Sequence, residues 1–226
     1  MNLLGRLERK YKRFAIPNLI MFIIIGTACV FAVETANPSS QIISLLALRT
    51  DLVLHGELWR LFSFIFIPPS MSFLWVFFAL YFYYLVGTGL EQEWGTFKFN
   101  VFYLTGIIFN ILAAFLAQFF IPNLFITATY MNLALFLAFA QIYPNFEVRL
   151  FLILPIKVKY LAWLNWAFLI YTLIFGHIGI KILALVPIAN FFLYFGNDFF
   201  RDLKRRRQVQ INRKRFFTET RKSDKD

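Results

Sequence analysis

Few side chains in this chain of 226 residues are suited to covalent or metal chemistry. The two histidines, His55 and His177, lie far apart in the sequence, and neither belongs to a recognisable motif. The single cysteine, Cys29, lies inside an apolar segment, so it can form neither an intrachain disulfide nor a multi-thiolate metal site. We expect Cys29 to be a small buried side chain. The sequence therefore predicts no metal site and no cofactor.

Hydroxyl and amide side chains inside apolar segments are the remaining candidates for a site. Thr129 and Asn132 are three residues apart, so in a helix they share one face. Such groups either form hydrogen bonds between helices, worth roughly 0.6–2 kcal/mol each, or bind a ligand, and both roles stay open. Hydrogen bonding between helices is also expected for the other amides in apolar segments: Asn110, Gln118, Gln141 and Asn165.

The elements that position these residues follow from composition. Hydrophobic residues make up 60% of the chain and charged residues only 15%, against roughly 25% charged in an average soluble domain. Apolar runs near the length that crosses a bilayer predict an all-α membrane protein, because lipid offers the backbone no hydrogen-bond partner. The six expected transmembrane helices cover about residues 17–33, 72–90, 99–120, 125–142, 160–175 and 180–195.

The distribution of positive charge predicts the orientation. The net charge is +11, and most of the 23 Lys and Arg residues lie in residues 1–16, in residues 198–226 and in two loops between spans. Six spans with both termini in the cytoplasm place nearly all of them inside, as the positive-inside rule requires. We expect the basic tail, 198–226, to attract anionic lipid, and we do not expect a nucleic acid partner. A protein partner of the tail stays open.

The one long connection, residues 34–71, is predicted to lie outside and to fold back into the membrane interface. It is too apolar for a disordered loop, and its periodicity fits two short amphipathic helices at about 41–48 and 57–65. Trp59 suits the headgroup region, and Arg60 can reach lipid phosphate or backbone carbonyls from that depth. The pair is expected to anchor the loop.

The segment "GELWRLFSFIF", followed by "VGTGLEQEWGTFKFNVFYLTG", resembles the rhomboid superfamily and its derlin branch. The resemblance extends over residues 17–197 and implies a rhomboid-like bundle of six transmembrane helices with an interfacial helical first loop. The positions that match the scaffold motifs of that family are Trp59, Arg60, Gly87, Leu90, Glu91 and Gly95.

The resemblance fails at the positions where rhomboid proteases carry their chemistry. Thr129 stands at the place of the family's catalytic serine, and Asn190 stands at the place of its histidine. Trp75 and Ala79 replace the pair that helps to hold the oxyanion. An asparagine cannot accept and return a proton near neutral pH, so the resemblance implies a pseudoprotease. If the last span packs beside the fourth, as in rhomboids, Asn190 joins Thr129 and Asn132 in an interhelical polar cluster.

The function expected from this resemblance is that of a catalytically inactive rhomboid-like protein, which binds transmembrane segments of other membrane proteins in their quality control, turnover or trafficking. Two alternatives stay open: an active intramembrane peptidase with a non-standard site, and a small-solute transporter or channel. A transporter is less favoured because no charged residue lies in the middle of a span. The short loops suggest a bacterial plasma membrane, and the oligomeric state is left open.

Overall fold

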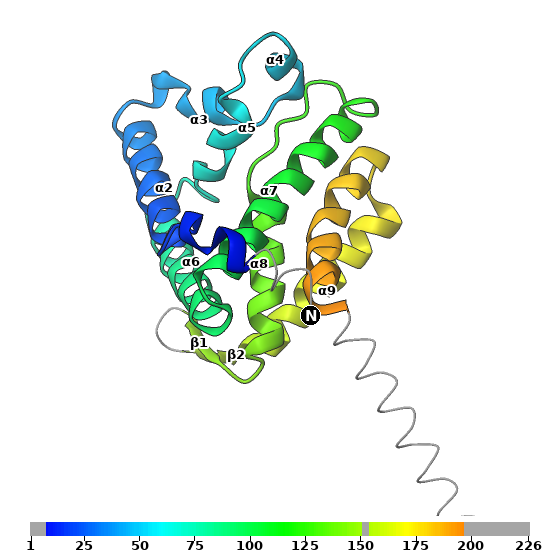
Figure 1. Cartoon of the computed structure of the whole chain (residues 1–226). Coiled ribbons are helices and arrows are strands. Elements are labelled where there is room, and N and C mark those ends of the chain that lie inside the picture. Colours follow the sequence, from blue (N-terminus) through cyan, green and yellow to red (C-terminus); the bar gives the residue numbers. More distant parts are fainter. Residues whose placement is uncertain (1–7, 151–153, 197–226) are drawn as a thin grey trace, which may run out of the picture. The chain divides into compact units, whose positions relative to one another are not determined.

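The computed structural model describes residues 8–150 and 154–196 (Figure 1). The chain forms two units, Met1–Asn190 and Phe191–Asp226. The basic tail 198–226 and the first seven residues lie outside the described residues, so the predictions made for them stay predictions.

Helices dominate the described chain and appear in all six regions where spans were predicted. The long helices are α2 (Leu19–Ala36), α6 (Phe73–Trp94), α7 (Thr96–Gln118), α8 (Thr129–Ile142), α9 (Val158–Phe175) and the helix Ile178–Gly196. The short helix η1 (Lys12–Phe14) precedes α2. The first loop contains further short elements: η2 (Pro38–Ser40), α3 (Ile42–Leu46), α4 (Thr50–Leu54), α5 (Arg60–Ser63) and η3 (Phe64–Phe66). Two strands, β1 (Glu147–Leu150) and β2 (Leu154–Lys157), complete the set.

Five of these helical segments are long and apolar enough to cross a membrane: Glu8–Ala36, which contains α2, then α6, α7, α9 and Ile178–Gly196. The sixth, α8, has 14 residues and is about 21 Å long, shorter than the roughly 30 Å hydrocarbon core. The prediction of an all-α membrane protein is thus confirmed at the level of class, with a small hairpin added.

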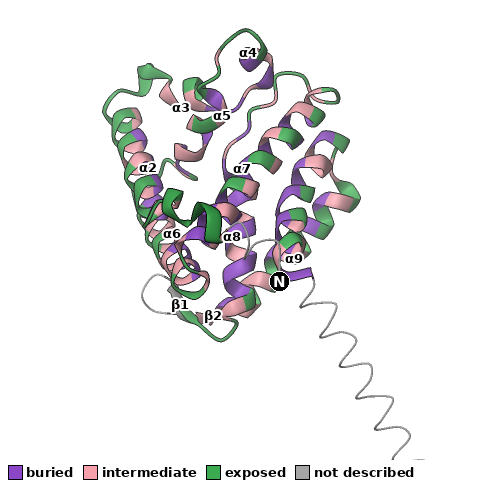
Figure 2. Cartoon of the chain, in the orientation of Figure 1, coloured by how far each residue is buried: buried purple, intermediate pink, exposed green. Residues whose placement is uncertain are grey.

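The long helices present apolar side chains outward, which is how a bundle meets lipid. Phe22 on α2, Phe77 on α6 and Trp163 on α9 are all exposed, and Figure 2 shows exposed residues along the outer faces of the helices. Exposed apolar surface on this scale is foreign to a soluble monomer. Cys29 is also exposed, so the prediction that it is buried is wrong. Cys29 lies on the same side of α2 as the exposed side chains of Phe22 and Ile25, an apolar surface of the kind that meets lipid.

Close helix contacts depend on small residues. On α7, the residues Gly106, Ala113, Ala114 and Ala117 are all buried, as expected where helices approach closely in a membrane. Gly87 on α6 is also buried, and an added Cβ would overlap the side chain of Ile20 on α2. The packing of α2 against α6 therefore requires a glycine at position 87.

The predicted scaffold motif holds the ends of three helices together. Leu90 is fully buried, and the carboxylate of the next residue, Glu91, accepts a 3.0 Å hydrogen bond from the Asn18 backbone N–H at the start of α2. A carboxylate suits this place because the N-terminus of a helix carries partial positive charge. Gly95 ends α6 with a φ of +79°, a conformation that a side chain disfavours, and it allows the immediate turn into α7.

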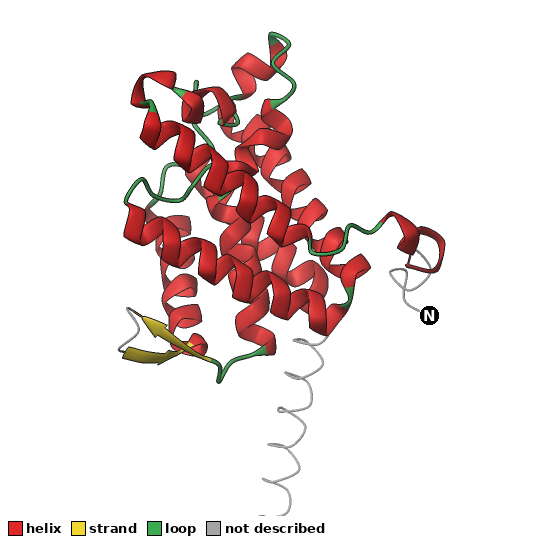
Figure 3. Ribbon diagram, turned by 90° about the vertical axis from the view of Figure 1, so that its left-hand side faces the viewer, coloured by secondary structure: helices red, strands yellow, loops and turns green. Residues whose placement is uncertain are grey.

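The first loop and the hairpin lie at opposite ends of the bundle, as both ribbon views show (Figures 1 and 3). β1 and β2 pair antiparallel, with Glu147 opposite Lys157. These strands were not predicted, because four-residue strands are too short for their alternation to stand out between long apolar runs.

The first loop contains more helix than predicted. The expected pieces at 41–48 and 57–65 correspond to α3 and to α5 with η3, but α4 at Thr50–Leu54 was missed. Arg49 and Asp51 interrupt the apolar pattern there, so the periodicity gave no signal. Gly56, with a φ of +105°, follows α4 and turns the chain toward α5.

Candidate functional site

Arg60 organises the first loop from the inside. Its side chain is not a surface anchor, because the residue is only 3% exposed. Its Nη1 donates hydrogen bonds to the backbone oxygens of Ser44 and Ala47, at 2.6 and 2.9 Å, and its Nε and Nη2 both lie 2.6 Å from the Glu57 carboxylate. The guanidinium was expected to reach either lipid phosphate or backbone carbonyls, and the structure selects the carbonyls.

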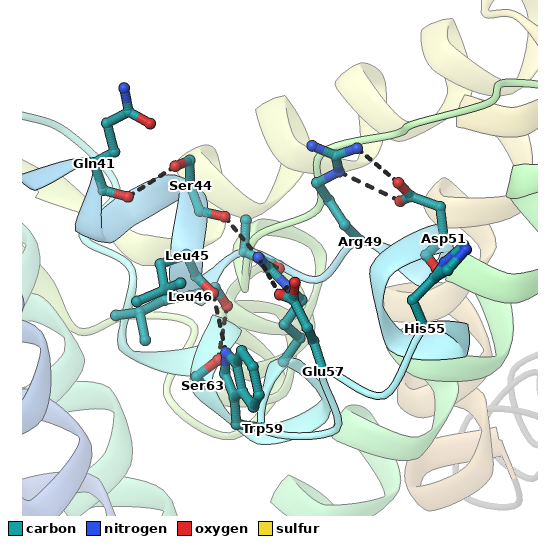
Figure 4. A network of polar contacts seen from close by, with 12 residues as sticks. Gln41, Ser44, Leu45, Leu46, Arg49, Asp51, His55, Glu57, Trp59 and Ser63 are labelled. Atoms are coloured by element: carbon teal, nitrogen blue, oxygen red, sulfur yellow. Dashed lines mark hydrogen bonds and ion pairs between the residues drawn. The ribbon is translucent and has the colours of Figure 1, made fainter.

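The neighbours of Arg60 also donate hydrogen bonds to carbonyls at the end of α3. Trp59 Nε1 donates to the Leu45 oxygen at 3.3 Å, and Ser63 Oγ donates to the Leu46 oxygen at 2.8 Å (Figure 4). The last carbonyls of a helix have no partner within that helix. In this loop, four successive carbonyls at the end of α3 are bonded by side chains from α5 and its N-cap. Trp59 remains half-exposed, so its indole still faces the surroundings of the loop.

A second, more exposed ion pair lies at the start of α4. Arg49 donates to the two Asp51 carboxylate oxygens at 3.3 and 2.6 Å. This hydrogen-bonded guanidinium lowers the pKa of the Asp51 carboxyl, although partial desolvation opposes the shift. His55 Nδ1 lies 2.7 Å from the Asp51 backbone oxygen, so His55 closes α4 and contacts no candidate nucleophile that the structure describes.

The loop is tied to the segment that leads into α8. Leu48 and Ile126 exchange backbone hydrogen bonds of 3.0 and 3.2 Å, and both residues are buried. Buried backbone groups outside a helix need hydrogen-bond partners within the protein, and this pairing supplies them. Because Leu48 follows Ala47 directly, the Arg60 hydrogen bonds also fix the approach to Thr127 and Thr129.

Thr129 lines a cavity with a volume of about 500 Å³, which is in the range of ligand pockets. The helices α6 and α9 both pack on α8, and the cavity lies among the three. Its lining is mostly apolar and is formed by Pro69, Phe82, Tyr83, Thr129, Asn132, Leu133, Phe136, Leu161, Leu164, Asn165 and Phe168. Leu164 is 71% exposed and Phe168 is also exposed, so the cavity opens toward the lipid side of α9.

Two amides give this cavity its polar character. Asn132 Nδ2 donates to the Tyr83 hydroxyl at 2.9 Å and joins α8 to α6. Asn165 on α9 is only 7% exposed, and among the described residues no hydrogen-bond partner reaches its Nδ2 or its Oδ1. The expectation that Asn165 bonds a neighbouring helix is therefore wrong. Asn110 also departs from that expectation, since its Nδ2 donates to Gly106 in its own helix.

The residues predicted at the degenerate catalytic positions are distributed over different places. Thr129 Oγ1 lies 2.8 Å from Thr127 Oγ1, and Thr129 lines the cavity together with Asn132. Asn190 is fully buried, and its Oδ1 accepts a 3.0 Å hydrogen bond from Thr105 on α7. Asn190 Nδ2 points to the Phe102 backbone oxygen at 3.4 Å. The structure thus brings Thr129 and Asn132 together, whereas Asn190 bonds to α7.

The positions expected to replace the oxyanion pair face elsewhere. Trp75 is exposed and Ala79 is half-buried, and neither lines the cavity. His177 precedes the helix Ile178–Gly196, where its Nδ1 accepts a 3.4 Å hydrogen bond from the Gly179 backbone N–H. Within residues 8–150 and 154–196, no three His, Cys, Asp or Glu side chains form a group suited to a metal ion.

Tyr83 was not singled out from the sequence, nor was it predicted that Asn165 lacks a hydrogen-bond partner among the described residues. Tyr83 is one of many aromatic residues in α6, so its type carried no signal. The type and place of Asn165 did carry a signal, because an amide in the middle of an apolar run is costly without a hydrogen-bond partner. Only the packing of α9 on α8 decides whether that partner exists.

The fold and the burial pattern define a polytopic, helical integral membrane protein. Residues 18–201 match the family described as eukaryotic integral membrane protein (DUF1751), and the chain belongs to this family. The match covers nearly all of the helical region. No curated protein matches the sequence. Because the family is eukaryotic, the expectation of a bacterial membrane is not supported.

Proposed function

We propose that this chain is a catalytically inactive, rhomboid-like membrane protein that binds transmembrane segments of other membrane proteins and so serves in their quality control, turnover or trafficking. The observation that carries the proposal is the mostly apolar cavity bounded by α6, α8 and α9, with the exposed Leu164 and Phe168 at its edge. A site of this kind suits a ligand that arrives within the bilayer.

The alternation of the long helices supports a six-span arrangement with both termini in the cytoplasm. The first loop and the hairpin lie at opposite ends (Figure 3), and the hairpin carries Lys157 beside the start of α9. The positive-inside rule favours the cytoplasm for that end. α8 is short for a span, and the hydrogen-bonded backbone of Ile126, paired with Leu48, precedes it by three residues.

The hydrogen bonds of Thr129 and Asn190 support the absence of hydrolysis. The Thr129 hydroxyl is paired with the Thr127 hydroxyl, and a hydroxyl is no general base. Asn190 uses its amide oxygen on Thr105, away from the cavity. A nucleophile without an adjacent base remains a weak nucleophile.

Site-specific photocrosslinking in liposomes tests the proposal. A photoreactive residue at Leu164 should capture a single-span membrane protein reconstituted in the same bilayer. The same residue at Phe22, on the exposed face of α2 and outside the cavity lining, is the matched control. Equal capture at the two positions would contradict a binding site among α6, α8 and α9. Cleavage of the captured protein would contradict inactivity while preserving the site.

A further inference from the structure

We infer that Asn165 is the specificity-determining residue of this cavity and that it hydrogen-bonds an amide or hydroxyl side chain inside the bound transmembrane segment. The inference rests on the proposed function and names the chemistry that the site selects. It starts from the state of the Asn165 amide: the residue is 7% exposed, and its donor and its acceptor both lack a partner within the described residues.

The surroundings of Asn165 make that state costly. Leu161, Leu164 and Phe168 lie one turn or less away on α9 and line the same cavity. An amide in such apolar surroundings is penalised unless it is hydrogen-bonded. The other cavity amide, Asn132, already donates to Tyr83, so it does not need a ligand to the same degree. Asn165 is therefore the group that a ligand completes.

The depth of Asn165 identifies the source of the partner. It lies seven residues after Val158 and ten before Phe175, near the middle of α9. Lipid headgroups lie about 15 Å from the bilayer centre, and an acyl chain has neither donor nor acceptor. A side-chain amide of Asn or Gln supplies both a donor and an acceptor, and a Ser or Thr hydroxyl does the same. A transmembrane helix with one such residue near its centre matches the amide and the apolar lining together.

The cavity should therefore discriminate between transmembrane helices with a central polar residue and helices without one. In lipid, a transmembrane helix with a single side-chain amide has a polar group without a hydrogen bond until it contacts another helix. Pairing it with Asn165 satisfies two amides at once. A purely apolar helix fills the cavity but leaves Asn165 without a bond, so it binds less tightly.

Two synthetic peptides distinguish these ligands. Both are single-span helices of leucine and alanine, one with a central Asn and the other with Leu at the same place. Liposomes contain the full chain with a photoreactive residue at Leu164, and the crosslinked fraction is measured against peptide concentration. The wild-type Asn165 background should prefer the Asn peptide by roughly three- to thirty-fold, the range expected for hydrogen bonds between helices in lipid.

Variants of Asn165 separate selectivity from folding. Asn165→Leu keeps the γ branching and the number of heavy atoms of the side chain but removes the amide. It should bind both peptides equally, at the level of the Leu peptide on the wild type. Asn165→Gln keeps an amide and should keep the preference. Trp163→Leu, on the exposed side of α9 and outside the cavity lining, should change nothing. Because Asn165→Leu removes an unpartnered amide, its thermal unfolding temperature should be no lower than that of the wild type.

The outcomes distinguish the inference from the proposal beneath it. Equal capture of both peptides by the wild type would overturn the role of Asn165, for example because water satisfies the amide, and would leave the binding site standing. A preference that survives in Asn165→Leu would also overturn it. Capture of neither peptide would overturn both the inference and the proposed function.

Discussion

Replacing Arg60 by alanine tests whether the first loop is held by the buried guanidinium. The substitution leaves the Ala47 carbonyl without a partner at a fully buried residue, which costs about 1–3 kcal/mol. It also separates Glu57 from its cation. Since the Glu57 side chain is 31% exposed, its carboxylate regains solvent, and the loss stays below the roughly 3–5 kcal/mol of a fully buried pair. We expect a total loss of about 2–4 kcal/mol in the free energy of unfolding.

The consequence should extend to the cavity. Arg60 holds Ala47, and the next residue, Leu48, pairs with Ile126 just before Thr129. Loosening of this chain of contacts should expose the first loop to limited proteolysis in the folded protein. It should also lower the yield of crosslinking from Leu164 to a transmembrane segment.

Equilibrium unfolding of the purified protein in mixed micelles, followed by the fluorescence of its five tryptophans, measures the loss. Arg49→Ala is the matched control, because Arg49 lies in the same loop and its pair with Asp51 is 31% and 22% exposed. Such a pair contributes about 1 kcal/mol or less. Arg60→Lys should fall between the wild type and Arg60→Ala, since an ammonium lacks the planar fork. If Arg60→Ala destabilises no more than Arg49→Ala, the guanidinium does not hold the loop.

Three further predictions concern the scaffold, pH and chemistry. Gly87→Ala should lower the free energy of unfolding by about 1–3 kcal/mol, because the added Cβ overpacks against α2. Gly196→Ala is the control and should cause no such loss, because a Cβ there meets nothing closer than 3.9 Å. Unfolding in micelles measures both variants. The pKa of Asp51 is lower in the folded than in the unfolded chain, so the stabilisation from its bond with Arg49 is present above the usual pKa of Asp and is lost as pH falls below it. Amide exchange in α4, corrected for intrinsic rates, should therefore quicken between about pH 5 and about pH 3, and less so in Asp51→Asn. A fluorophosphonate probe should not label Thr129, and labelling that disappears in Thr129→Ala would revive the peptidase alternative.

The class of the protein and the places of its helices were predictable from residue order. Hydropathy located all six regions because a backbone in lipid must satisfy its own hydrogen bonds, and a single helix does so locally. Gly87 and Gly95 were also found from short motifs, and the structure supplies their reasons, a close contact with α2 and a positive φ. The helices and the turn at Gly95 depend on neighbours along the chain, whereas the need for a glycine at position 87 comes from Ile20 on α2.

The roles of Arg60 and Asn165 were not predictable in the same way. Both are polar residues in apolar surroundings, and the sequence predicts a hydrogen-bond partner for each: phosphate or a carbonyl for Arg60, and a neighbouring helix for Asn165. The structure gives Arg60 two carbonyls and a carboxylate, and it gives Asn165 no partner among the described residues. The two carbonyl partners of Arg60 lie in α3 and at its C-cap, 16 and 13 residues earlier, and only the fold of the loop brings them within reach.

The cavity and the separation of Asn190 from Thr129 were likewise decided by tertiary structure. Composition and charge determined a helical membrane protein with buried amides. Which amide meets a hydroxyl, as Asn190 meets Thr105, and which one remains open on a cavity, as Asn165 does, depends on how α7, α8 and α9 pack. Helix formation in lipid is local, whereas hydrogen bonds between helices depend on distances between segments that residue order alone does not fix.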